Sequence, residues 1–437
     1  MGHPISNIVK RYKNGEEVGI FSVCCSNQYV IEAAMERLKD TSMHLLIEST
    51  ANQVDQFGGY TGMKPKDYIN YIYDLAEKNE FPKERIILGG DHLGPLTWTN
   101  LDEETAMENS KNLIREYVLA GFTKIHIDTS MMIKGDLERG DFGDEVIAKR
   151  AAILCKVAED AYKDLLKEDK NAIHPVYVIG SEVPIPGGAQ AEEEEEDTIQ
   201  VTKVENFKNT VETFEKAFVQ LGLDDALNYV TGIVVQPGVE FGSDIVFEYN
   251  RDAAKELSEA IKSYDNLVFE AHSTDYQTKD SLKKMVQDGY IILKVGPALT
   301  FGFREGAFSL NEMENELLKY RPDLETSRFM DILEFNMVKN PKDWIKHYSG
   351  SNEKIKFDRI YSLSDRCRYY MPKDDVNFAL ERMLDNLNEV DIPITLVSQF
   401  MHNQYKKVRE GKLKLEAREL LKDRIGEYID DYIFAVN

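Results

Sequence analysis

The chain has 437 residues, more than one compact core usually holds, which predicts one large domain with an appended part. Lysine and arginine number 53 against 77 aspartates and glutamates, a formal net charge of −24. This balance argues against nucleic acid and anionic membranes as partners. No apolar run approaches the ~20 residues of a membrane helix. The first residues lack a signal segment and the four cysteines form no CxxC pair, so we expect a reduced, cytoplasmic protein.

Short β-rich runs alternate with longer segments in which apolar residues recur at the three- and four-residue spacing of helices. Each of eight such runs is followed by a helical segment, which predicts an α/β fold, a (β/α)8 TIM barrel. A doubly wound open sheet is the main competitor, but the turn VCCSNQ after the first run lacks the glycines of a phosphate-binding turn. The predicted strands are 18–24, 44–49, 85–92, 123–129, 175–182, 230–236, 266–272 and 290–296.

Beyond residue 320 the alternation stops and the sequence becomes helical throughout. We therefore predict a barrel over 1–320 that carries the site, and a helical C-terminal extension over 321–437 that packs on the barrel or serves assembly. We also expect a homo-oligomer. The acidic run AEEEEED (191–197) follows the fifth predicted strand, and its like charges favour an exposed loop over a functional segment.

Polar residues gather at the carboxyl ends of the predicted strands, where TIM barrels place their active sites. Strands buried on both faces should be almost purely apolar, so this pattern needs a cause. Each residue alone has a structural alternative: a strand-end side chain can bond a loop, His126 can be a core histidine and Asp128 can cap a turn. The residues are Glu48, Asp91, His92, His126, Asp128, Glu182, Gln236, Glu270, His272 and Lys294.

The coincidence of several such residues on one rim points to metal chemistry. Two imidazoles with carboxylate or amide oxygens suit a divalent transition metal such as Zn, Mn or Co. Such a metal acts as a Lewis acid on a carbonyl or hydroxyl oxygen, and a neighbouring carboxylate moves the proton. Asp91, adjacent to His92, is placed for that second task.

Five long motifs resemble the GatZ and KbaZ accessory subunits of tagatose-1,6-bisphosphate aldolase. They are ESTANQVDQFGGYTGM (48–63), GGDHLGP (89–95), GSEVPIPGGAQ (180–190), FEAHSTDYQT (269–278) and SLSDRCRYYMP (362–372). The resemblance implies a non-catalytic partner of a class II aldolase chain, or a metal-dependent 4-epimerase of the kind described for similar proteins, which converts fructose to tagatose. Older labels call such proteins tagatose-6-phosphate kinases, but this chain has no GxxxxGK[ST] motif and no kinase signature set.

The strand-end pattern also resembles the class II aldolases, in which an Asp-His pair supplies a proton-transfer acid and a metal ligand. By that resemblance Asp91 moves protons and His92 and His272 are ligands. Gln236 stands where those aldolases have a further histidine, and Glu182 completes the set. We predict a second proton carrier, Asp128, and a group of substrate-binding residues: Glu48, Asn52, Gln53, His126, Glu270, Lys294 and Arg366.

The main hypothesis is thus a metalloenzyme that acts on a ketohexose or its phosphate by aldol-type cleavage or 4-epimerisation. The alternative is a binding subunit that stabilises and activates a class II aldolase chain. Arg366, Arg368 and Tyr369 in the tail motif could hold an anion over the barrel mouth, or could belong to an ion-paired surface helix. Without a basic cluster at the mouth, a free sugar becomes the better substrate.

Overall fold

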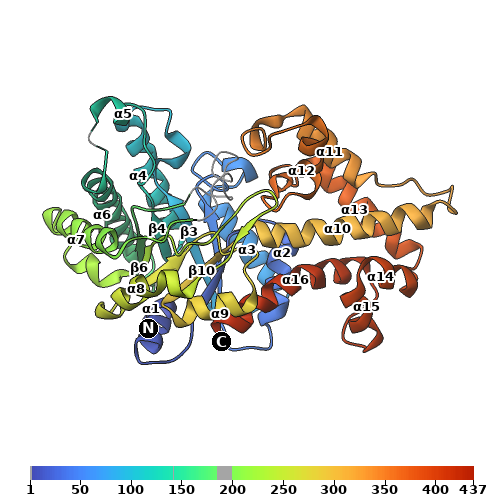
Figure 1. Ribbon diagram of the computed structural model, residues 1–437, viewed down its shortest axis with the longest axis horizontal. Helices are drawn as coiled ribbons and strands as arrows, with labels where there is room; N and C mark the ends of the chain where they lie inside the picture. Colours follow the sequence, from blue (N-terminus) through green and yellow to red (C-terminus); the bar gives the residue numbers. More distant parts are fainter. Residues whose placement is uncertain (1, 141, 185–198) are drawn as a thin grey trace.

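The computed structural model describes residues 2–140, 142–184 and 199–437, so the acidic run 191–197 lies outside the described residues. Eight parallel strands close into a barrel in which the last strand pairs with the first, which confirms the predicted TIM barrel (Figure 1). A two-stranded antiparallel ribbon, β7 (Glu240–Phe241) and β8 (Val246–Phe247), follows the sixth barrel strand. The barrel strands are β1 (Ile20–Val23), β2 (Leu45–Thr50), β3 (Ile86–Leu93), β4 (Lys124–Ile127), β5 (Val176–Ile179), β6 (Val230–Val234), β9 (Val268–Ala271) and β10 (Tyr290–Val295).

A helix follows each barrel strand, as the helical spacing predicted. The strands are rich in Val, Ile and Leu and almost wholly buried, because the helices cover one face and the barrel interior the other. The helices that follow the strands are α2 (Gln28–Leu38), α3 (Pro65–Lys78), α4 (Glu103–Ala120), α6 (Asp144–Glu168), α7 (Val204–Gln220), α8 (Arg251–Ala260), α9 (Lys279–Gln287) and α10 (Pro297–Leu318), with a short α5 (Asp136–Arg139) before α6. All but α10 lie around the barrel, whereas α10 extends into the C-terminal extension (Figure 1).

The C-terminal extension stands at one side of the barrel and returns to it through its last helix (Figure 1). That helix, α16, packs against α10, α2 and α9, and the carbonyl of Val436 accepts a hydrogen bond from Gly19 just before β1. One hydrophobic core runs from the barrel into the extension. The extension comprises α11 (Phe329–Lys339), α12 (Asn352–Tyr361), α13 (Asp374–Glu389), α14 (Ile394–Phe400), α15 (His402–Arg409) and α16 (Ala417–Val436).

The helix that precedes the first barrel strand, α1 (Pro4–Lys13), contacts β6. The His3 side chain caps this helix, because its Nδ1 accepts a hydrogen bond from the backbone N–H of Ile5. Among the described residues, none of the helices combines the length and the apolar character needed to span a membrane.

Candidate metal and substrate site

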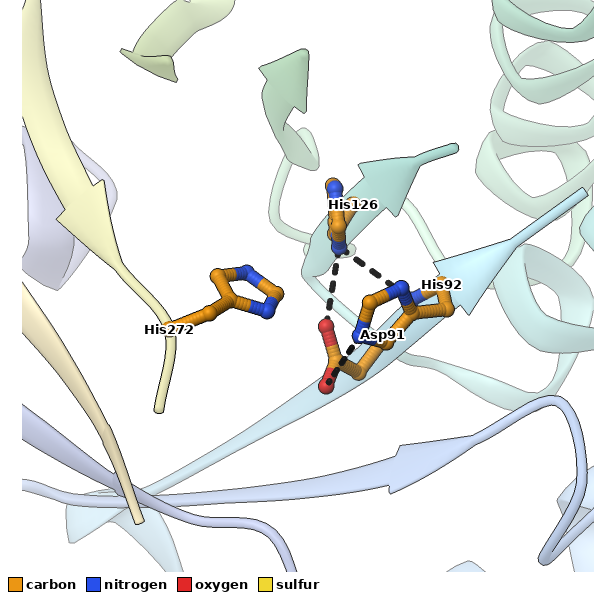
Figure 2. Close-up of side chains that lie close together, drawn as sticks. All are labelled: Asp91, His92, His126 and His272. Atoms are coloured by element: carbon orange, nitrogen blue, oxygen red, sulfur yellow. Dashed lines mark hydrogen bonds and ion pairs between the residues drawn. The ribbon is translucent and has the colours of Figure 1, made fainter. Parts of the chain in front are cut away.

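The Asp-His pair lies at the carboxyl end of β3, where the strand departs from regular geometry. Successive side chains of a strand point to opposite faces, so a regular strand would send Asp91 and His92 apart. His92 instead adopts a left-handed backbone conformation (φ 50°), and the pairing of β3 with β4 shifts register between Gly90 and Leu93. This irregularity brings both side chains to one site (Figure 2).

Glycines allow the close approaches that this geometry needs. A Cβ on Gly94 would lie 1.8 Å from the carbonyl oxygen of Asp128, and one on Gly89 would lie 2.7 Å from Cγ of Glu48. No larger residue fits either position without displacing its neighbour. Packing around Asp91 and His92 therefore requires the glycines at both ends of GGDHLGP.

Three imidazoles and one carboxylate converge inside the barrel mouth (Figure 2). The rings of His92, His126 and His272 form a triangle with centroids 4.9 to 5.1 Å apart. Asp91 joins them, with Oδ1 2.8 Å from Nδ1 of His126. One nitrogen or oxygen from each of the four buried residues lies within 4.8 Å of the others, so the group could hold a metal ion.

Carboxylates outside the group fix the orientation of two of its imidazoles. Asp128 Oδ2 lies 2.8 Å from Nδ1 of His92, and Glu270 Oε1 lies 3.0 Å from Nε2 of His272. A carboxylate on one ring nitrogen sets the tautomer and leaves the other nitrogen for a metal. Asp128, which we predicted to move protons, therefore holds His92 in place.

The pKa shifts follow from burial and from the neighbouring charges. Burial lowers the pKa of His272 to about 4, so this imidazole is neutral at pH 7, as a metal ligand must be. Burial also opposes the charged form of His92, but Asp91 and Asp128 more than offset it and leave the pKa of His92 raised. Burial alone would raise the pKa of Asp91, yet Lys294 and His92 hold it well below its ordinary value, so Asp91 is ionised.

A layer of paired charges lies beneath the histidines. Lys124 Nζ lies 2.8 Å from Glu48 Oε2 and 2.6 Å from Glu270 Oε2. Lys294 Nζ lies 2.8 Å from Glu48 Oε1 and 3.0 Å from Asp91 Oδ1, so it connects this layer to the metal-binding group. Glu48 and Glu270, which we predicted to bind substrate, are wholly buried within these pairs.

The sequence reasoning missed Lys124, although a signal was present. Residues 124, 126 and 128 alternate along β4 and its end, so the period that placed His126 and Asp128 on one face also places Lys124 there. A lysine inside a barrel strand needs a carboxylate partner, and the glutamates of β2 and β9 supply it.

The structure separates two of the predicted ligands from the histidines. It does not bring Glu182 or Gln236 to the histidines: Glu182 accepts hydrogen bonds from Thr202 and Asn206, and Gln236 Oε1 accepts from the backbone N–H groups of Gly238 and Val239. Their oxygens are used locally because both residues lie past the strand ends, in the following loops. His126, predicted as a substrate contact, takes their place in the group.

A cavity of about 470 Å³ opens over the histidines. Three residues that we predicted to contact substrate, Asn52, Gln53 and Lys294, line this cavity. Asp91, His92 and His272 line it as well. Arg366, also predicted to bind substrate, does not line the cavity; its Nε donates a hydrogen bond to the carbonyl of Asp343. Arg368 of the same motif lines the cavity instead. The extension thus forms part of the cavity wall, through Phe329, Arg368, Tyr369, Met371, Pro372, Val376, Asn377, Leu380 and Glu381.

Comparison with known proteins places this chain in a family. The family model described as D-tagatose-1,6-bisphosphate aldolase subunit GatZ/KbaZ-like matches residues 5–437. The chain belongs to the GatZ/KbaZ-like family. It is 45% identical over 430 residues to GatZ subunits of that aldolase from Salmonella dublin and from Salmonella enteritidis PT4, covering 98% of this chain and 98% of each relative.

A solved structure of a similar protein shares the fold of this GatZ/KbaZ-like chain. It is described as a probable tagatose 6 phosphate kinase from Sinorhizobium meliloti 1021 and is 40% identical, with a TM-score of 0.85 over 96% of this chain and 100% of that chain. The family resemblance predicted from the motifs is therefore confirmed over nearly the whole length.

Proposed function

We propose that this chain is a divalent-metal-dependent enzyme that acts on a ketohexose or its phosphate, by aldol-type cleavage or by 4-epimerisation. The observation that carries the proposal is the buried group of Asp91, His92, His126 and His272, with carboxylates orienting two of the rings. Three imidazoles and a carboxylate within reach of one point are the donors that a divalent transition metal binds, which supports an enzyme over a binding protein without chemistry.

The donor set fits Zn, Mn or Co, because imidazole and carboxylate are the ligands that these ions share. When bound, the metal would polarise a carbonyl or hydroxyl oxygen of the sugar. His92 and His272 offer the nitrogens that their carboxylates leave free, and His126 completes the triangle.

Asp91 is the proton carrier in this proposal. It is ionised and lies in the cavity wall beside the three imidazoles, so it is placed to take a proton from a sugar hydroxyl and to return it. Lys294 holds the Asp91 carboxylate at 3.0 Å and so fixes its position. Asn52 and Gln53 line the same cavity and can hold other hydroxyl groups of the substrate.

The alternative is a subunit that stabilises and activates a class II aldolase chain. It is supported by the names of the relatives, which are called subunits of an aldolase. In that case the metal-binding group would be a relic or would sense a ligand. We propose no kinase activity, although the solved relative is named a probable kinase, because the sequence has no phosphate-binding P-loop.

Metal analysis and turnover assays of the isolated chain distinguish the metal-dependent enzyme from the accessory subunit. We expect bound divalent metal and conversion of fructose, tagatose or their phosphates, abolished by His92→Ala and by Asp91→Asn. His402→Ala, a change on the surface of α15, is the matched control and should leave both unchanged. Absence of metal and of turnover, with formation of a complex with a class II aldolase chain, would establish the alternative. The oligomeric state, expected to be a homo-oligomer, is measurable on the same sample by light scattering.

A further inference from the structure

A cavity of about 830 Å³ lies at the end of the barrel opposite the metal-binding group. Its lining includes residues that precede three adjacent strands: His174 lies just before β5, Tyr229 just before β6 and Asn266 just before β9. Parallel strands all begin at one end of a barrel, so this amino-end cavity is remote from Asp91 and His92, which lie at the carboxyl end of β3. Its volume falls in the range of about 300–1,000 Å³ that is typical of small-molecule sites.

Helix α1 forms one wall of the amino-end cavity. Ser6, Val9 and Lys10 of this helix line the cavity, as does its capping residue His3. The helix precedes the first barrel strand and contacts β6. A ligand in the cavity would therefore contact α1 and the segments before three barrel strands at the same time.

The lining of the amino-end cavity is basic, although the protein is acidic. Lys10 and Lys170 line the cavity, and none of the described lining residues is an aspartate or a glutamate. Neither lysine forms an ion pair within the ranges that the structure describes. Two ammonium groups without a carboxylate partner give this cavity a positive local potential in a chain with a net charge of −24, and such a potential attracts anions.

The cavity also offers hydrogen-bond donors that the chain leaves unused. Thr231 of β6 lines it, and the buried Oγ1 of this residue has no hydrogen-bond partner among the described residues. A buried hydroxyl without a partner destabilises a fold, so its presence calls for an explanation such as a ligand oxygen. Asn171 and Asn266 add side-chain amides to the same lining.

One wall of the amino-end cavity is held in place before any ligand binds. The His174 ring stacks on Tyr229 with centroids 3.5 Å apart and contacts Tyr162 edge-on at 4.4 Å. Nε2 of His174 lies 3.2 Å from Glu159 Oε1, and the Tyr162 hydroxyl donates to the carbonyl of Ala172 at 3.2 Å. A wall fixed by these contacts loses little conformational freedom on binding, which favours affinity.

We propose that the amino-end cavity is a binding site for a small dianionic metabolite, a phosphate monoester or a dicarboxylate, held by Lys10 and Lys170. Two ammonium groups match the charge of a phosphate monoester, about −2 at pH 7, better than that of a monoanion. Lysine binds as a point charge and so serves either kind of oxyanion. The site uses none of the residues of the metal-binding group, and its ligand joins α1 to the barrel and so stabilises the folded chain.

Calorimetric titration of the whole chain tests this site without requiring turnover. The probes are inorganic phosphate, glycerol 3-phosphate, succinate and acetate, compared at one ionic strength. We expect a dianion to bind about tenfold tighter than acetate, since a second charged contact contributes about that factor. At 100 times its Kd the dianion should raise Tm by about 3 °C. Glycerol 3-phosphate binding tighter than succinate assigns a phosphate ester, and the reverse order assigns a dicarboxylate.

Substitution then locates the binding. Lys10→Met and Lys170→Met should each weaken dianion binding about 3- to 10-fold, and both are exposed positions at which the chain tolerates the change. Lys66→Met, on the exposed face of α3 and outside this lining, is the matched control and should leave the affinity unchanged. His92→Ala, which disrupts the metal-binding group at the other end of the barrel, should also leave it unchanged.

Three results would overturn the amino-end site. They are dianion affinity no greater than that of acetate, affinity that Lys10→Met and Lys170→Met leave as it is in the unmodified chain, and binding that His92→Ala abolishes. Dianion binding that depends on the two lysines in a chain without metal or turnover would leave this site standing and refute the proposed enzyme. The two proposals therefore fail separately.

Discussion

Substitution of Lys124, the buried lysine beneath the histidines, measures how much the paired charges stabilise the barrel. In Lys124→Met the side chain keeps its approximate length and loses its charge. Glu48 and Glu270, which Lys124 contacts at 2.8 and 2.6 Å, are then left with Lys294 as their remaining cation, at 2.8 Å from Glu48 and 3.9 Å from Glu270. Removing one partner of a buried ion pair costs about 3–5 kcal/mol, because the other charge stays buried without compensation.

That free energy converts to a measurable shift of the unfolding temperature. An unfolding entropy of about 2.1 cal/mol/K per residue gives about 0.9 kcal/mol/K for 437 residues. Lys124→Met should therefore lower Tm by about 3–5 °C in differential scanning calorimetry at pH 7. Adding Glu48→Gln to this variant should recover part of the loss, because it removes one of the uncompensated carboxylates.

A surface lysine provides the matched control. Lys83 pairs with Glu77 at 3.2 Å, but both side chains are largely exposed, so Lys83→Met should change Tm by less than about 1 °C. If Lys124→Met has as small an effect as Lys83→Met, or if Glu48→Gln worsens it, the charged layer does not stabilise the barrel in the way argued.

Three further predictions concern other parts of the chain. Asp128→Asn should weaken metal binding about 10- to 100-fold in a chelator competition titration, because it loosens His92; an unchanged affinity would contradict the orienting role. Burial lowers the pKa of His3 to about 4, so the folded state disfavours its protonation, and stability falls as the pH drops from 6.5 towards 4. The loss is about 2 kcal/mol at pH 5 and should be absent in His3→Asn, as denaturant unfolding at pH 7.5 and pH 5 would show. Gly94→Ala should destabilise the fold by about 1–3 kcal/mol, whereas Gly143→Ala, where no atom lies within 4 Å of the new Cβ, should not; equal denaturation midpoints would refute the close approach to Asp128.

The barrel could be predicted from the sequence because its signals are local. Each predicted strand overlaps an observed one, since β-rich runs separated by helical spacing leave few other arrangements. The inward-facing residues of the strands, such as His126 and Glu270, follow from the two-residue period in the same way. The sequence also identified the third strand end, with Asp91 and His92, as the centre of the site.

The tertiary structure decided which of these residues meet. Glu182 and Gln236 follow strands like the others, but hydrogen bonds in the loops engage their side-chain oxygens. Glu182 accepts one from Asn206, which is remote in the chain, and Gln236 accepts one from Gly238 in the turn that follows it. The left-handed conformation of His92 depends on the register with β4, and the approach of Arg368 to the mouth depends on how the extension folds back over α10. Sequence periodicity sets the direction of a side chain on its own element, whereas the distance between two elements is set by packing. Packing therefore decided which side chains converge in the barrel and where the extension lies.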